Sequence, residues 1–71
     1  MEFIFTDHAK KRMRERSVSE ATVKSAIDKP DILQETILNR KIAIKLLEEK
    51  RLEVVYVKEG HKIIVITTYE N

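Results

Sequence analysis

The sequence predicts a small α+β domain in which two short helices pack on a mainly antiparallel sheet. Two observations support this fold class. Apolar residues recur at helical spacing through the first 30 residues, whereas from Ile32 onward they follow period two and are largely β-branched. The chain has 71 residues with one Gly and one Pro. Because this leaves no room for a flexible linker, we expect residues 1–71 to form a single domain.

The first elements are a brief strand and a helix. Residues 2–5 carry β-favouring Phe and Ile, which predicts the strand. Thr6 or Asp7 can accept hydrogen bonds from the free N–H groups of a following turn, so we expect the helix to start there and to run to about Glu15. Its buried stripe consists of Ala9 and Met13.

A second helix is predicted between two serines and the proline. Ser17 and Ser19 are both candidate N-caps, and Glu20 completes a Ser-x-x-Glu capping pattern from Ser17. The apolar face is formed by Val23, Ala26 and Ile27. Pro30 ends the helix, because the residue before a proline is disfavoured in helical conformation.

The second half of the chain is expected to form a four-stranded meander. The expected strands are residues 32–38, 42–47, 52–57 and 62–69, and the turns between them are Asn39-Arg40, Glu49-Lys50 and Glu59-Gly60. The last two strands are apolar on both faces, which is typical of central strands. We expect the helices to cover one face and a partner to cover the other.

Composition excludes several classes of protein. Hydrophobic residues make up 42% and charged residues 37% of the chain, which predicts a folded domain without a membrane span. The N-terminal residues lack the layout of a secretory signal, so we expect a cytoplasmic protein. No Cys is present, and a disulfide framework or a Cys-based zinc site is therefore excluded. A core of this size rarely supplies more than roughly 3–5 kcal/mol, so we expect a homo-oligomer or a complex.

Basic residues are concentrated in the first predicted helix. Lys10, Lys11, Arg12, Arg14 and Arg16 lie within seven residues and are opposed only by Glu15. Such a cluster attracts phosphate backbones. The alternative interpretation is a solvated helix face. The sequence contains no phosphate loop, HExxH or GxSxG motif, so nucleotide hydrolases, zinc proteases and serine hydrolases have no support.

His8 lies on the same border of this helix as Arg12 and Arg16, at successive steps of four. Cleavage of RNA through its own 2′-hydroxyl needs removal of a proton, positive charge on the phosphorane and protonation of the leaving oxygen, and none of these needs a metal. A histidine can serve the proton transfers and arginines can supply the charge. The alternative is a capping or core-edge histidine with arginines paired to nearby carboxylates.

Hydroxyl groups on the predicted central strands are further candidates. Tyr56, Tyr69, Thr67 and Thr68 could bond to phosphate, and the tyrosine rings could stack on bases. Their β-propensity alone also explains their presence. Lys45 alternates with Ile44 and Leu46 and is a cation on one face of the sheet.

A series of short motifs spans nearly the whole chain: Phe5-Thr6-Asp7-His8-Ala9, Arg12-Met13, Arg16, Ser19-Glu20, Val23, Pro30-Asp31, Val54-Val55-Tyr56 and Val65-Ile66-Thr67. They resemble a small prokaryotic family of uncharacterised domains that opens with a Thr-x-His-Ala helix and is grouped with the RelE/ParE toxin superfamily. The resemblance implies two helices laid on an antiparallel sheet, with RNA cleavage on the ribosome or inhibition of a protein target as the activity.

On the family pattern, His8 and Arg16 match the opening helix and Thr67 matches the closing strand. Ser17 stands where the family commonly has Gly, which predicts a different helix–helix geometry. RelE-like nucleases tend to use basic residues on the sheet and a tyrosine near the C-terminus, a position that Tyr69 could fill.

We therefore expect a toxin-like RNA-binding module that acts as a metal-independent endoribonuclease of a toxin–antitoxin system, without metal or cofactor. The expected catalytic residues are His8, Arg12, Arg16, Tyr56 and Tyr69, and the expected RNA-binding residues are Lys10, Lys11, Arg14, Lys45 and Thr67. RNA or the ribosome and a cognate antitoxin protein are the expected partners. The alternative is a non-catalytic protein-binding module, such as a gyrase-type inhibitor or a degenerate toxin.

Overall fold

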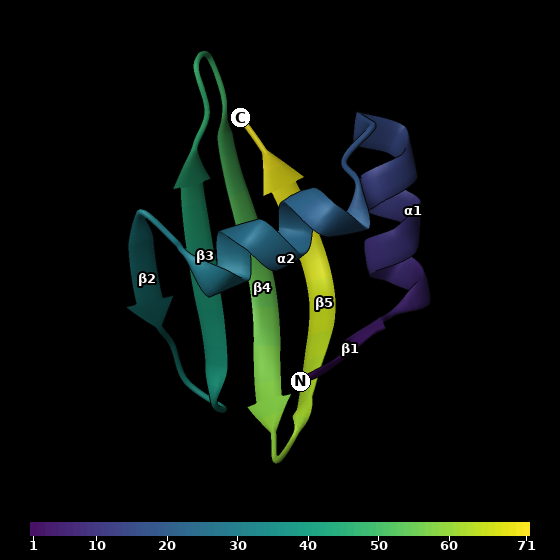
Figure 1. The fold of residues 1–71 in the computed structure, drawn as a ribbon, viewed down its shortest axis with the longest axis vertical. Helices are drawn as coiled ribbons and strands as arrows, with labels where there is room; N and C mark the ends of the chain where they lie inside the picture. The colour runs from purple at the N-terminus through teal and green to yellow at the C-terminus, as the bar shows by residue number, and fades with distance from the viewer.

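The computed structural model describes all residues from 1 to 71 and has the predicted α+β architecture (Figure 1). In chain order the elements are β1 (Glu2–Phe5), α1 (Asp7–Arg16), α2 (Glu20–Asp28), β2 (Ile32–Glu35), β3 (Arg40–Leu46), β4 (Arg51–Glu59) and β5 (Lys62–Glu70). In Figure 1, α2 crosses in front of the sheet and α1 lies beside β5. No helix is long and apolar enough to cross a membrane.

The sheet has five strands in the order β1-β5-β4-β3-β2. Strands β2 to β5 are antiparallel neighbours, as a meander requires. The sheet has one strand more than the four of the predicted meander, because the predicted N-terminal strand, β1, pairs in parallel with β5 at its edge. Backbone hydrogen bonds from Glu2 N–H to the His61 carbonyl (2.8 Å) and from Thr6 N–H to the Val65 carbonyl (3.1 Å) fix this extra strand.

Both helices begin at a capping hydroxyl. The Thr6 Oγ1 accepts from the Ala9 N–H at 3.0 Å, and the Ser19 Oγ accepts from the Thr22 N–H at 3.1 Å. Of the two predicted caps of α2, Ser19 is confirmed and Ser17, with its capping pattern to Glu20, is wrong. Ser17 instead ends α1 in the left-handed conformation at φ 56°, with its N–H bonded to carbonyls of the last turn. The chain uses this reversal to bring both helices onto the same sheet.

One apolar cluster lies between the helices and the sheet. It contains Ala9, Met13, Val23, Ala26, Ala43, Leu52, Val54, Tyr56, Ile63 and Val65, and Phe3, Phe5, Val18 and Ile27 pack against it. Along β4 its members alternate, because every second side chain of a strand points to the same face. The chain itself places no helix on the opposite face, where Val55, Val57 and Ile64 are only half-buried. Strands β4 and β5 are thus apolar on both faces, but the helices cover only one of these faces.

A bulge interrupts the pairing of β4 with β5. Val55 pairs with Thr67 and Tyr56 pairs with Val65, so Ile66 has no residue opposite it. The Ile66 carbonyl accepts a hydrogen bond from the Thr6 Oγ1 at 2.8 Å. The hydroxyl that caps α1 thus also satisfies the backbone at the bulge and ties the helix to the sheet.

The first hairpin turn differs from its predicted position. β2 ends at Glu35 instead of residue 38, and β3 already begins at Arg40. The reversal uses Leu38 and Asn39, which both have positive φ angles of 63° and 60°. Asn tolerates this conformation well, but Leu does not. Gly60 also adopts the predicted left-handed conformation, at φ 60°.

Candidate anion-binding site

The predicted catalytic residues of α1 lie on the surface. His8 and Arg16 are exposed, and Arg12 is half-buried. The Arg12 guanidinium lies 3.9 Å from the Glu15 carboxylate, which is the intrahelical ion pair of the alternative interpretation. Exposed pairs of this kind contribute little to stability. The predicted RNA-binding residues of this helix, Lys10, Lys11 and Arg14, are exposed as well.

The two predicted catalytic tyrosines lie on opposite faces of the sheet. Tyr56 belongs to the apolar cluster beneath the helices and is 6% exposed. Tyr69 pairs with Glu53, whose side chain lies on the opposite face from Tyr56, and it is 50% exposed. Thr67 shares the face of Tyr69, is buried, and its Oγ1 has no hydrogen-bond partner. The structure therefore does not bring the five predicted catalytic residues together in one site.

Lys45 lies on the helix-covered face, because it pairs with buried Leu52. Its Nζ donates to the Lys29 carbonyl at 3.0 Å and lies 4.0 Å from the Asp31 carboxylate. This ammonium group therefore ties the end of α2 to β3. The Lys45 ammonium, which was expected to bind RNA, is therefore already bound to a backbone carbonyl and a carboxylate of its own chain.

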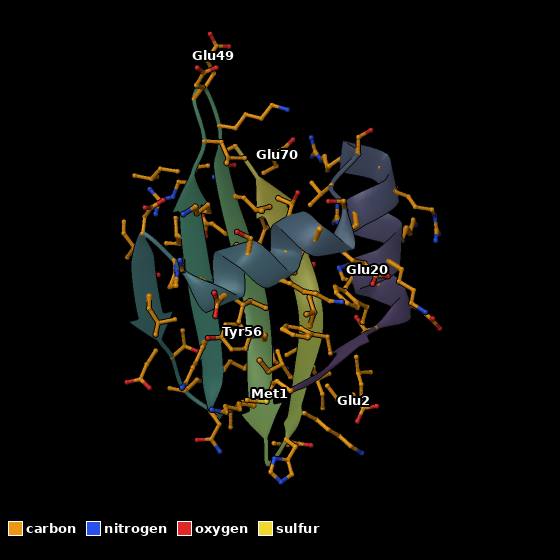
Figure 2. The ribbon with its side chains drawn as sticks, in the orientation of Figure 1. Met1, Glu2, Glu20, Glu49, Tyr56 and Glu70 are labelled. Atoms are coloured by element: carbon orange, nitrogen blue, oxygen red, sulfur yellow. The ribbon has the colours of Figure 1, made fainter.

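Tyr56 instead lines a cleft of about 730 Å³ below α2. Figure 2 shows Tyr56 and Met1 in this part of the molecule, below the helix. The walls come from the start of the chain, the second half of α2 and strands β3, β4 and β5. The lining residues are Met1, Phe3, Lys24, Ser25, Ile27, Asp28, Lys29, Lys41, Tyr56, Lys58 and Ile63.

The charge around this cleft is mainly positive. Four lysines line it, namely Lys24, Lys29, Lys41 and Lys58, and Asp28 is the one carboxylate among the lining residues. None of the four lysines belongs to an ion pair. The Lys24 Nζ lies 5.4 Å from the centre of the Phe3 ring, within cation–π range. The negative end of the α2 dipole offsets part of this charge, but four ammonium groups without partners still favour an anionic ligand.

The Tyr56 hydroxyl is a hydrogen-bond donor at neutral pH. Desolvation by burial, and then the negative charge of Glu35, raise the pKa of Tyr56 above its ordinary value of 10.0. No internal hydrogen bond uses this hydroxyl. A phosphate oxygen in the cleft would accept from it.

A second hollow, of about 670 Å³, continues the cleft toward the first and last hairpin turns. It is lined by Glu35, Thr36, Asn39, Lys41, Lys58 and Gly60. Lys41 and Lys58 line both hollows, so these two side chains lie at the boundary between them. The combined surface, which we call the Tyr56 cleft, is open, and its two adjoining hollows suit a chain-like ligand better than a small enclosed one.

Sequence reasoning identified Tyr56 but missed all four lysines. A signal for two of them was present, because Lys58 lies two residues after Tyr56 and Lys41 two residues before buried Ala43. Period two places each on the helix-covered face. The contributions of Lys24 and Lys29 depend on how α2 crosses the sheet, which no local pattern encodes. No group of His, Asp or Glu side chains is arranged to hold a metal ion.

Comparison with protein families matches residues 5–70 to DUF4258, a domain of unknown function. The chain belongs to the DUF4258 family. The match covers both helices and strands β2 to β5, so all lining residues of the Tyr56 cleft except Met1 and Phe3 lie within the matched range. Comparisons with curated proteins and with solved structures find no match.

Proposed function

We propose that this DUF4258 domain is a toxin-like RNA-binding module that holds the phosphate backbone of RNA in the Tyr56 cleft. The observation that carries the proposal is the set of four lysines without ion-pair partners around the cleft. Phosphate contacts dominate the affinity of proteins for nucleic acids. The Phe3 ring, which also lines the cleft, holds the Lys24 ammonium over its face and so keeps this cation in the site. Such a module would act in the cytoplasm, where its RNA substrate is found.

The grouping with the RelE/ParE toxin superfamily forms part of the proposal. It is supported by the order of elements, with two helices followed by an antiparallel sheet, and by the short motifs along the chain. Under this proposal, a cognate antitoxin neutralises the protein and the substrate is free or ribosome-bound RNA.

The proposed reaction is metal-independent cleavage of RNA. The 2′-oxygen attacks the adjacent phosphorus and loses its proton to a base, while the bond to the 5′-oxygen breaks and that oxygen takes up a proton. The products are a 2′,3′-cyclic phosphate and a 5′-hydroxyl. Lysines of the cleft would stabilise the phosphorane, and the protonated Tyr56 hydroxyl would donate to a phosphate oxygen. His8, the acid or base expected from the sequence, lies on α1 and lines neither hollow of the Tyr56 cleft, so solvent water carries the two proton transfers in this proposal.

Binding is tested by titrating a fluorescent single-stranded RNA with the wild type and with the Lys41→Gln/Lys58→Gln variant at several salt concentrations. Removing two phosphate contacts should weaken binding and lower the slope of log K against log salt by about 1.4. Lys11→Gln/Lys62→Gln is the matched control, because it removes two exposed lysines that belong to no ion pair and lie outside the Tyr56 cleft. Equal effects of the two variants would show that only net charge matters and would reject the cleft as the binding site.

Cleavage is tested without metal on a defined RNA, with and without ribosomes. We expect Tyr56→Phe to lose cleavage while its circular dichroism spectrum is unchanged, and His8→Ala, outside the Tyr56 cleft, to keep cleavage. If the wild type binds RNA but cleaves it under neither condition, the nuclease part of the proposal fails and the binding part stands.

The alternative is a non-catalytic module that binds an acidic protein through α1. It is favoured by the exposed basic surface of Lys10, Lys11, Arg14 and Arg16, which lies outside the Tyr56 cleft. A partner captured from the source cells in equal yield before and after nuclease treatment, and lost in Lys10→Gln/Lys11→Gln, would favour this function.

A further inference from the structure

The strand β2 forms a bare edge of the sheet. All ten residues from 31 to 40 are exposed, and β3 is the only element with which β2 makes extensive contact. Figure 1 shows β2 at the margin of the sheet, beyond the end of α2. The apolar side chains here include Ile37 and Leu38, which are 81% and 76% exposed. Natural proteins rarely leave such an edge uncovered, because its free backbone groups pair with other strands.

The backbone groups available for pairing follow from the register. Thr36 N–H donates to the Arg40 carbonyl, and Gln34 and Ile32 pair with Ile42 and Ile44. In an antiparallel ladder, alternate residues direct their N–H and C=O groups to the same side. Leu33 and Glu35 therefore direct theirs away from β3, toward solvent. A second antiparallel strand could take up these four groups.

We propose that β2 pairs antiparallel with β2 of a second copy of this chain about a two-fold axis, which joins two five-stranded sheets into one. Three two-fold registers use the free groups of Leu33 and Glu35. One places Glu35 opposite Glu35 of the second copy, and another places Glu35 opposite Asp31, so both oppose like charges. The third places Leu33 opposite Glu35 and Gln34 opposite Gln34. Charge therefore selects the third register, with the axis at Gln34.

This register also covers the exposed hairpin tip. Thr36 of one copy comes opposite Ile32 of the other, so the hairpin tip that follows Thr36 lies near the segment between α2 and β2 of the second copy. Leu38 holds a left-handed backbone conformation at φ 63°, which is costly for a Leu. Its side chain makes little contact within its own chain, and a contact across the axis would explain why an apolar residue occupies this position. Two-fold dimers are the commonest symmetric assemblies of soluble proteins.

The register is tested with a single cysteine, since the chain contains none. In the proposed dimer the two Gln34 residues form a non-hydrogen-bonded pair, with Cα atoms about 4.5 Å apart, which lies in the range for a disulfide. Under mild oxidation, Gln34→Cys should therefore form a covalent dimer much faster than Glu49→Cys, an exposed control in the β3–β4 turn. Equal rates for the two variants would overturn the register.

The dimer itself is tested by sedimentation equilibrium at protein concentrations into the hundreds of micromolar. Leu33→Pro removes only an N–H that points away from β3, so this variant should keep its circular dichroism spectrum but sediment as a monomer. Glu35→Gln keeps the backbone groups and should still form the dimer. A wild type that stays monomeric over the whole range, or a folded Leu33→Pro variant that dimerises as well as the wild type, would overturn the proposal. RNA binding is measured separately on Leu33→Pro, because Leu33 lines neither hollow of the Tyr56 cleft whereas Glu35 lines the second one.

Discussion

Thr6 joins α1 to the sheet, and replacing it with Val tests how strongly this hydroxyl holds the fold together. The Oγ1 accepts from the Ala9 N–H at 3.0 Å and donates to the Ile66 carbonyl at 2.8 Å. Thr6→Val removes both hydrogen bonds and keeps the branched shape. Ser19→Ala is the matched control, because Ser19 caps α2 in the same way but lies at an exposed site and makes no bond to the sheet.

The two substitutions should differ in size. Loss of an N-cap typically costs about 1 kcal/mol, which is the whole expected effect of Ser19→Ala. Thr6→Val also leaves the Ile66 carbonyl without its partner at a bulge, which adds about 1 kcal/mol. The expected total of about 2 kcal/mol is a large fraction of the roughly 3–5 kcal/mol that a core of this size supplies.

Urea unfolding at a fixed protein concentration measures the difference. With a slope of about 1 kcal/mol per molar urea, the midpoint should fall by about 2 M for Thr6→Val and by about 1 M for Ser19→Ala. The fixed concentration matters because dimerisation would add to the apparent stability. Equal midpoint shifts for the two variants would refute the reasoning, since the bond to Ile66 would then contribute nothing.

Two further predictions concern Ser17 and Tyr56. Ser17→Gly should raise the free energy of unfolding by about 1 kcal/mol, because Gly adopts the left-handed conformation without strain; Ser17→Ala keeps the Cβ and should give no such gain in the same urea assay. The raised pKa of Tyr56 means that the fold favours the protonated hydroxyl. Its contribution to stability is therefore present below the unfolded pKa of about 10 and is lost as pH rises through the folded pKa. Wild-type stability should fall more steeply above about pH 10 than that of Tyr56→Phe, and parallel pH profiles would contradict the assigned cause.

Local patterns predicted the elements of the fold well and their boundaries less well. Thr6 was correctly expected near the start of α1, because a hydroxyl before a helical stripe satisfies free N–H groups wherever the helix lies. Ser17 and Ser19 were indistinguishable as caps of α2, since both precede the same stripe. The structure decides for Ser19, because Ser17 is needed to reverse the chain after α1. Local patterns also misplaced the first hairpin turn, because Leu38 takes a left-handed conformation that its residue type disfavours.

The predicted site fared differently, because a site combines residues from distant parts of the chain. His8, Arg12 and Arg16 were grouped correctly along one helix, but spacing on a helix says nothing about what faces it. Tyr56 and Tyr69 were treated as equivalent, although the bulge and the pairing of β4 with β5 place them on opposite faces. The lysines of the Tyr56 cleft come from α2, β3 and β4, and they meet only where these elements cross.

The sequence by itself determined the α+β class, the two helices, the meander and the positions of most turns. These features follow from hydrophobic period, capping hydroxyls and left-handed turn residues, all of which act within a few positions of the chain. Only the tertiary structure decided that β1 joins the sheet beside β5, that four lysines without ion-pair partners surround Tyr56, and that β2 is left as a bare edge. Each of these depends on contacts between residues far apart in sequence, whose geometry is fixed by the packing of α1 and α2 on one face of the sheet.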